Sequence, residues 1–215
     1  MRPAALLSPA CLASLALAGC GQEAGRERVR AGSLAQGPAP GEAPRAAVAP
    51  GRGERAPVLL RGTVTRLNGE PDDLARYRGK VVLVVNTASE CINTGQYGEL
   101  EALFRAHRGE GLVVLGFPAN DFAGQEPGTN GQIAAFCERN FGVSFPMFAK
   151  TTVVGDRALP FFRRLAAASQ PPSWNFTKYL LDRRGRLAQR FDPYLPADAP
   201  GLRRAIRRLL ASSGG

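Results

Sequence analysis

Histidine is nearly absent from this sequence, since His107 is the only one among 215 residues. A single imidazole at the end of a predicted helix excludes a Ser-His-Asp or Cys-His arrangement for hydrolysis, and we expect His107 to lie on the surface. Cysteine is also scarce: there are four residues, without zinc-finger spacing and without enough histidine to complete a tetrahedral metal site. The sequence therefore predicts neither a metal centre nor a bound cofactor.

Acidic residues are too few to balance the basic ones. Lys and Arg number 28 against 18 Asp and Glu, which gives a formal net charge of +10. The densest basic cluster, Arg203, Arg204, Arg207 and Arg208, falls on one polar face of a predicted C-terminal helix. Such a face is either simply solvated or weakly attracted to an anionic membrane. No motif combines aromatic and basic residues as nucleic-acid-binding proteins do, so no nucleic-acid partner is predicted.

The N-terminal apolar stretch, residues 4–18, is too short to span a bilayer and follows one basic residue, Arg2. Residues 1–20 are therefore interpreted as a signal peptide. Two cleavage sites compete. Residues 17–20 resemble the lipobox of bacterial lipoproteins, which would leave an acylated Cys20 first, whereas an A-x-A site ending at Ala18 would release a soluble periplasmic protein. The position of Cys20 favours the lipobox, and several acyl chains would anchor it stably.

The segment after the signal peptide has little that could form a core. Residues 21–56 consist mainly of Ala, Gly and Pro, and their only large aliphatic side chains are Val29, Leu34 and Val48. Such a composition predicts a disordered linker. From residue 57 to 215 the composition is globular. We therefore expect one folded domain that is lipid-anchored to a membrane of the bacterial cell envelope and faces the periplasm.

The folded part is organised around an apolar strand that leads to a cysteine. Residues 81–85 form an uninterrupted run of Val and Leu, typical of a strand buried on both faces of a sheet. Apolar residues recur at helical spacing from Gln96, so Cys91 is predicted in a polar loop between a strand and a helix amino terminus. Chemistry gathers at this place in α/β sheets, and the helix dipole favours a thiolate there. The alternative is a small buried thiol that only fills space.

The remaining pattern predicts a single α/β domain without internal repeats. Strands are expected at residues 58–67, 112–117 and 145–154, a helical turn at 74–77, helices at 96–107, 130–140, 160–167 and 200–210, and a hairpin at 179–181 and 187–191. In this scheme Cys137 lies inside a helix.

Two cysteines remain for the folded domain, because Cys11 leaves with the signal peptide and Cys20 is interpreted as acylated. Cys91 and Cys137 could form a structural disulfide, as is common in exported proteins, or perform redox chemistry, and spacing alone leaves both alternatives open. A thiol that acts without a histidine base needs hydrogen-bond donors and a helix end to stabilise its charge. Such a thiol suits attack on a peroxide.

Four stretches of the domain together resemble the glutathione peroxidase family. They are residues 85–103 (VNTASECINTGQYGELEAL), 115–128 (LGFPANDFAGQEPG), 136–149 (FCERNFGVSFPMFA) and 174–181 (WNFTKYLL), in the order and spacing of that family. The resemblance implies a thioredoxin-like α/β fold, with a central mixed β-sheet flanked by α-helices. It also implies a peroxidase in which Cys91 is the peroxidatic residue, as cysteine in place of selenocysteine.

Position by position, the resemblance assigns Gln125, Trp174 and Asn175 to a catalytic tetrad with Cys91. Two amides and an indole N–H are neutral donors that can hold a thiolate and the departing oxygen without adding a titrating group. Taken singly, Gln125 could be a turn residue, Trp174 a core aromatic and Asn175 a cap. Their order and their combination with Cys91 favour the tetrad.

Cys137 lies where thioredoxin-dependent members of the family, such as the yeast enzymes, have their resolving cysteine. The resemblance implies that hydrogen peroxide or an organic or lipid hydroperoxide oxidises Cys91 to a sulfenic acid, and that Cys137 then forms a disulfide with it. A thioredoxin-type protein, or alternatively glutathione, would reduce that disulfide. Because the two sulfurs lie apart in reduced family members, the helix would have to open locally, and residues 137–142 are predicted to be poor in apolar contacts.

The chain departs from the family pattern at several positions. Ala119 stands where cysteine is common, Asp121 where glutamine is common, and residues 92–95 (INTG) replace Gly-Phe-Thr-Pro, which predicts a looser start of the following helix. The stretch between Pro160 and Trp174 is too short for the loop that builds tetramers in some relatives. We therefore expect a monomer whose open site admits bulky lipid hydroperoxides.

Two other functions remain as alternatives. One is a peroxide sensor that relays oxidation to a partner protein, and the other is a catalytically silent lipoprotein with a structural bridge between Cys91 and Cys137. A disulfide oxidoreductase is less consistent with the sequence, because Thr94 occupies the second cysteine position of a Cys-x-x-Cys motif. A peroxiredoxin is also less consistent, because Ala88 replaces the threonine of its motif.

Overall fold

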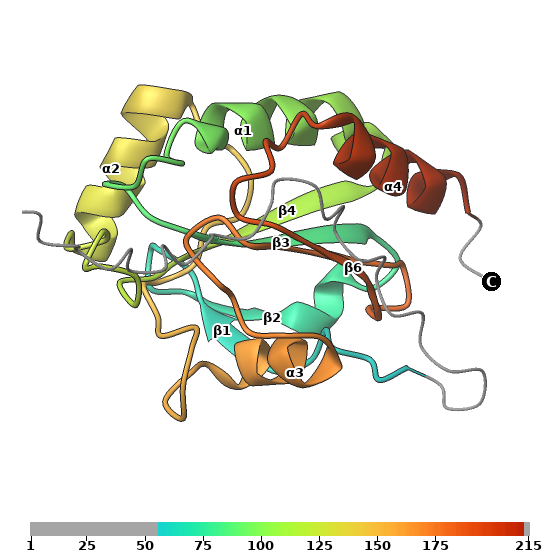
Figure 1. Ribbon diagram of the computed structural model, residues 1–215, viewed down its shortest axis with the longest axis horizontal. Helices are drawn as coiled ribbons and strands as arrows, with labels where there is room; N and C mark the ends of the chain where they lie inside the picture. Colours follow the sequence, from blue (N-terminus) through green and yellow to red (C-terminus); the bar gives the residue numbers. More distant parts are fainter. Residues whose placement is uncertain (1–55, 213–215) are drawn as a thin grey trace, which may run out of the picture. The chain divides into compact units, whose positions relative to one another are not determined.

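The computed structural model describes residues 56–212 (Figure 1). The predicted signal peptide, with Cys20, and nearly all of the predicted linker lie outside the described residues. Within residues 56–212, no helix combines the length and the apolar character needed to cross a bilayer.

A four-stranded mixed sheet forms the centre of the domain. Its strands are β3 (Val81–Thr87), β4 (Leu112–Pro118), β5 (Lys178–Leu181) and β6 (Leu187–Phe191), in the order β4-β3-β5-β6. Strand β3 pairs in parallel with β4 and antiparallel with β5, which pairs antiparallel with β6. Every residue of β3 is buried. The prediction of a central strand covered on both faces is therefore confirmed.

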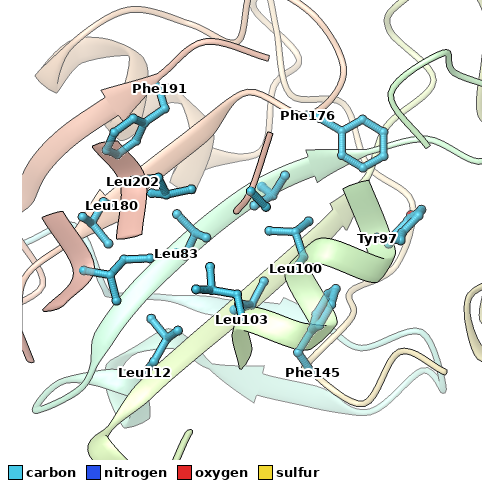
Figure 2. Packing of buried hydrophobic residues seen from close by; sticks show 14 of the residues in the cluster. Leu83, Tyr97, Leu100, Leu103, Leu112, Phe145, Phe176, Leu180, Phe191 and Leu202 are labelled. Carbon is cyan, nitrogen blue, oxygen red and sulfur yellow. The ribbon is translucent and has the colours of Figure 1, made fainter. Parts of the chain in front are cut away.

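One face of the sheet is covered by α1 (Gln96–His107) and α4 (Pro200–Ala211), which lie above the strands in Figure 1. Leu83 of β3, Leu100 of α1 and Leu202 of α4 belong to one buried cluster, drawn in Figure 2. The four arginines of α4 are exposed on the opposite side of that helix. The predicted amphipathic terminal helix is thus confirmed.

The other face is covered by α3 (Pro160–Ala168), the 3-10 helix η1 (Leu74–Tyr77) and a hairpin of β1 (Thr63–Thr65) and β2 (Pro71–Asp73). Val84 of β3 packs into this second cluster. Successive side chains of a strand point to opposite faces, so both clusters draw apolar residues from the same short run. Two further helices complete the domain: η2 (Arg108–Glu110) continues α1, and α2 (Asn130–Phe141) lies beside α1 at one end of the sheet (Figure 1).

The prediction of a strand at residues 145–154 is wrong. Met147 forms only an isolated parallel bridge with Gly116, and the next residue, Phe148, forms an isolated antiparallel bridge with the first hairpin. Pro146 has no N–H to donate, and neighbouring residues pair with different partners, so no continuous ladder can form. The apolar residues here pack as an irregular segment across the sheet edge.

Two smaller expectations also change. The strand expected at residues 58–67 contracts to β1, because Gly62 has a left-handed φ of 91° that interrupts an extended chain. His107 is not fully on the surface: 14% of its side chain is exposed, and its Nδ1 lies 2.9 Å from a carboxylate oxygen of Glu110. The other predicted helices and strands are confirmed to within one or two residues at most ends.

Gly116 in β4 is predicted to tolerate a methyl group poorly. A Cβ at this position would overlap Sδ of Met147 and lie 3.1 Å from the ring of Phe145. We expect Gly116→Ala to lower the free energy of unfolding by about 1–3 kcal/mol through overpacking, measured by urea denaturation. The control is Gly201→Ala in α4, where a Cβ meets nothing within 4 Å. This substitution should raise the free energy of unfolding by about 0.5–1 kcal/mol. Unchanged stability of Gly116→Ala would contradict the close packing at this point.

Candidate active site

The loop between β3 and α1 contains Cys91 and is held by Thr94. The N–H of Cys91 donates to Oγ1 of Thr94 at 3.0 Å, and the Thr94 hydroxyl lies 2.6 Å from the carbonyl oxygen of Cys91 and 3.1 Å from that of Ala88. Helix α1 begins directly after Gly95, which makes no side-chain capping bond. The threonine therefore stabilises the turn that precedes an uncapped helix.

Cys91 is more buried than its polar neighbours predicted, with 8% of its surface exposed. Its sulfur accepts the backbone N–H of Asn93 at 3.4 Å. This donor and the amino terminus of α1 both favour negative charge on Sγ. The structure thus places the thiol between a strand end and a helix start, as predicted.

Gln125 and Asn175 are joined by a hydrogen bond next to the cysteine loop. Nδ2 of Asn175 donates to Oε1 of Gln125 at 3.0 Å. The loop contacts both residues, because the N–H of Glu90 donates to the backbone oxygen of Gln125 at 3.0 Å and Nδ2 of Asn93 lies 3.5 Å from the backbone oxygen of Asn175. Among residues 56–212, Nε2 of Gln125 has no acceptor, so it is available to a bound molecule.

Trp174 lies in the same turn as Asn175, and the end of β3 holds that turn. Nδ2 of Asn86 donates to the carbonyl oxygen of Trp174 at 3.1 Å, and the carbonyl oxygen of Asn86 accepts the N–H of Phe176 at 2.7 Å. The half-buried indole packs on Phe122, with ring centroids 5.5 Å apart. Phe176 has a left-handed φ of 71°, which costs a non-glycine residue about 1–2 kcal/mol. The two bonds to Asn86 offset that cost.

Sequence reasoning missed three buried polar residues around this site: Asn86, Glu126 and Lys178. Nζ of Lys178 donates to the carbonyl oxygens of Phe176 at 2.9 Å and Pro193 at 3.3 Å, and burial lowers its pKa to about 8. A polar residue directly after or within an apolar strand was the available signal for Asn86 and Lys178. Glu126 gave no such signal, because it follows Gln125 in a loop.

Cys137 lies in α2 with 2% of its surface exposed, and both it and Cys91 are free thiols. Burial raises the pKa of the Cys137 thiol to about 11. The end of α2 is not poor in apolar contacts, contrary to expectation. The ring of Phe141 lies 5.5 Å from that of Tyr97, and the ring of Phe136 lies 6.5 Å from it. Opening of α2 must therefore break aromatic packing.

The site joins the Cys91 loop to two amides and places an indole in the same turn as one of them, while Cys137 shares only the surrounding hydrophobic cluster. Within the part of the chain that the structure describes, no group of three or more His, Cys, Asp or Glu side chains could hold a metal ion. Neutral donors next to a thiol can stabilise a thiolate and an oxygen that leaves with negative charge. The arrangement therefore fits chemistry at sulfur.

Comparison with known proteins agrees with the family resemblance that the sequence showed. The family model described as glutathione peroxidase matches residues 59–166. The chain is 48% identical over 132 residues to a glutathione peroxidase homolog, BsaA, of Halalkalibacterium halodurans. The matched region covers 59% of this chain and 84% of the relative. It is 46% identical over 136 residues to the hydroperoxy fatty acid reductase gpx1 of Synechocystis sp., which covers 58% of this chain and 80% of the relative.

Solved structures show the same architecture. The crystal structure of Trgpx in apo form matches with a TM-score of 0.60 at 30% identity, over 74% of this chain and 100% of that chain. A thiol:disulfide interchange protein of the thioredoxin family from Chlorobium tepidum matches with a TM-score of 0.57 at 15% identity, over 74% and 99% of the two chains. The second likeness concerns the fold alone. The predicted thioredoxin-like fold is confirmed.

Cys137 is predicted to resist alkylation in the native protein. Because burial raises its pKa from 9.0 to about 11, the thiolate fraction at neutral pH falls roughly a hundredfold. Labelling by iodoacetamide, resolved by peptide mass spectrometry, should be slower by at least that factor than in the urea-unfolded chain. The native rate should rise about tenfold per pH unit until the thiol ionises. Equal rates in native and unfolded protein would contradict a buried, protonated thiol.

Proposed function

We propose that this chain, which belongs to the glutathione peroxidase family, is a thiol peroxidase that reduces hydrogen peroxide and organic or lipid hydroperoxides through Cys91. The observation that carries the proposal is the set of hydrogen bonds that brings Gln125 and Asn175 to the Cys91 loop, with Trp174 in the same turn. The reductase activity on hydroperoxy fatty acids in the name of one relative supports lipid hydroperoxides as substrates.

In the first step, the thiolate of Cys91 attacks one peroxide oxygen and the O–O bond breaks. The sulfur becomes a sulfenic acid, and the other oxygen takes up a proton from solvent, equivalent to the one that the thiol lost on ionising, and leaves as water or an alcohol. The N–H of Asn93 stabilises the thiolate before the attack. The free amide of Gln125 and the indole N–H of Trp174 then donate to the leaving oxygen, which holds its charge as the bond breaks.

In the second step, Cys137 attacks the sulfenic acid and forms a disulfide with Cys91. A thioredoxin-type dithiol protein then reduces the disulfide, with glutathione as the second candidate. The pair of cysteines favours the protein reductant, because a peroxidase with one cysteine would suit glutathione better. Cys137 is buried and its helix packs on Tyr97, so this step requires part of α2 to move.

Two alternatives differ from this proposal in what happens after oxidation. A peroxide sensor would share the first step and pass its oxidised sulfur to a partner protein. A silent protein with a structural bridge is less consistent with the two free thiols. Only the fold supports a disulfide oxidoreductase, because the similar interchange protein is 15% identical to this chain. In addition, Thr94 stands at the second cysteine position of the Cys-x-x-Cys motif of such enzymes.

The proposed place of action is the bacterial cell envelope. The N-terminal sequence, with Cys20 at the end of a lipobox-like stretch, supports a lipid anchor, and the Ala-, Gly- and Pro-rich segment after it supports a tether. The folded domain would then face the periplasm as a monomer. A membrane-tethered peroxidase would meet lipid hydroperoxides where they form.

Replacement of Cys137 by serine should separate the two steps. In Cys137→Ser we expect oxidation of Cys91 at the wild-type rate but loss of at least nine-tenths of the turnover with thioredoxin, because no disulfide can form. The assay is a matrix of hydrogen peroxide and lipid hydroperoxide against thioredoxin and glutathione, with Cys91→Ser as the inactive control. Unaltered turnover of Cys137→Ser with thioredoxin would remove Cys137 from the cycle.

The anchor is tested by replacement of Cys20. In a bacterial host, wild type should appear in the membrane fraction with an acylated N-terminal peptide. Cys20→Ala should lose the acyl groups and leave the membrane, while its peroxidase activity per molecule stays unchanged. A wild-type protein that is cleaved after Ala18 and contains unmodified Cys20 would instead support release as a soluble periplasmic enzyme.

A further inference from the structure

A cavity of about 510 Å³ lies between the Cys91 loop and the helix that contains Cys137. Ser89, two residues before Cys91, lines one side of it, and Ile133 of α2 lines the other. Ile133 lies one helical turn before Cys137 on the same buried face. The cavity therefore adjoins both the loop that leads to Cys91 and the buried face of α2 on which Cys137 lies.

The carboxyl group of Glu126 lines this cavity and has one oxygen without a partner. The side chain is 1% exposed. Its Oε2 accepts the hydroxyl of Ser89 at 3.2 Å, while its Oε1 is buried with no hydrogen-bond partner in the described chain. The backbone of Glu126 is fixed separately, because its N–H donates to Asn120 at 2.8 Å and its carbonyl oxygen accepts Nζ of Lys150 at 3.2 Å. The backbone position of Glu126 is therefore fixed without its carboxyl, whose own described contact is with Ser89 of the cysteine loop.

Charged and titratable groups face Glu126 from every neighbouring element. They are Glu90 in the cysteine loop, Tyr97 in α1, Cys137 and Arg139 in α2, and Lys150 after α2. Burial is the largest influence and raises the pKa of Glu126, the bond from Ser89 and the charge of Lys150 lower it, and the charge of Glu90 raises it. A carboxyl whose pKa moves toward neutrality is better matched to proton transfer at physiological pH.

Tyr97 connects the surroundings of the two cysteines. Its hydroxyl is buried and lies beside the thiol of Cys137 and the hydroxyl of Thr87, without the geometry of a hydrogen bond to either. Its ring packs edge-on against that of Phe176, with ring centroids 5.4 Å apart. Both residues are labelled in Figure 2. A small shift of α2 would let this hydroxyl accept the proton of Cys137.

We propose that Glu126 relays the proton of the disulfide-forming step, an inference that rests on the peroxidase function proposed above. As the sulfur of Cys137 attacks the sulfenic sulfur of Cys91, the thiol proton passes through the hydroxyl of Tyr97 to the carboxylate of Glu126. The hydroxyl of Ser89, which is hydrogen-bonded to the same carboxyl, then delivers a proton to the oxygen that leaves Cys91.

The step is balanced without a further reactant. The S–S bond forms while the S–O bond of the sulfenic acid breaks, so the sulfur of Cys91 is reduced and the sulfur of Cys137 is oxidised. The departing oxygen keeps its own hydrogen and receives the thiol proton, and it leaves as water. Glu126 returns to the ionised state in which it began.

Glu126→Gln tests the relay, because it preserves the volume and an oxygen for Ser89 but cannot accept a proton. Reduced full-length protein is mixed with one equivalent of hydrogen peroxide, without reductant, and quenched at intervals between pH 5 and 9. Sulfenic acid is trapped with dimedone, and the disulfide is quantified by peptide mass spectrometry. We expect sulfenic acid to form at the wild-type rate and the disulfide to form roughly a hundredfold more slowly.

The pH profile separates proton transfer from a structural role. In wild type the rate of disulfide formation should fall at acid pH as Glu126 becomes protonated, and this fall should be absent in Glu126→Gln and partly restored in Glu126→Asp. Ser89→Ala, which leaves the carboxyl in place, should also slow the step. Glu138→Gln, an exposed substitution next to Cys137, serves as the control and should behave as wild type.

A wild-type disulfide rate and pH profile in Glu126→Gln would overturn the relay while leaving the peroxidase function intact. An equal loss in Glu138→Gln would also overturn it, because the effect would then follow from any lost charge on this side of the molecule. Failure of wild type to form sulfenic acid would instead contradict the proposed function itself, and the relay with it. Melting temperatures of all variants show whether a slow step reflects a damaged fold.

Discussion

The pair of hydrogen bonds between Asn86 and the turn at Trp174 is the interaction on which the rest of the site depends. Asn86 follows directly on the apolar run of β3, so the packing of the sheet fixes its position. Its side chain and carbonyl oxygen hold the turn in a left-handed conformation at Phe176. In that conformation Asn175 donates to Gln125 beside the cysteine loop.

Most of the unpaired buried polar atoms in the described chain lie around the site. Of the eight buried side-chain atoms without a partner, six belong to Asn86, Thr87, Gln96, Tyr97, Glu126 and Asn175, and the other two belong to arginines elsewhere. A buried polar atom without any partner, water included, costs about 1–3 kcal/mol relative to a paired one. A fold that was selected for stability alone would pair or remove them. Their concentration around Cys91 makes this the most polar part of the interior, while the two hydrophobic clusters of the sheet supply stability.

The sequence was sufficient to predict the frame of the domain and the position of Cys91. The central strand, α1 and α4 follow from periodicity, because each buries a regular apolar pattern. The segment at residues 145–154 has the same apolar content but no strand, because Pro146 and two different partners prevent a ladder. Local pattern contains no information about which distant segments will pair.

The same limit applies to the site. Gln125, Trp174 and Asn175 could be assigned only through resemblance to a family, since their contacts join residues far apart in the chain. Glu126 shows the limit most clearly: its burial and its bond to Ser89 appear only once the loop folds against α2. The burial of Cys91 was likewise underestimated, because most of its loop is polar in sequence while its neighbours in space include a hydrophobic cluster.

The central claim is that donors from three segments make Cys91 a fast nucleophile toward peroxide. The most direct measurement is stopped-flow oxidation of the reduced protein by hydrogen peroxide, followed through the fluorescence of Trp174, the only tryptophan in the chain. The account predicts oxidation of Cys91 far faster than that of free cysteine at the same pH, and a loss of roughly 10²-fold or more in Gln125→Ala. Oxidation at the rate of free cysteine, or at the same rate in both proteins, would contradict it.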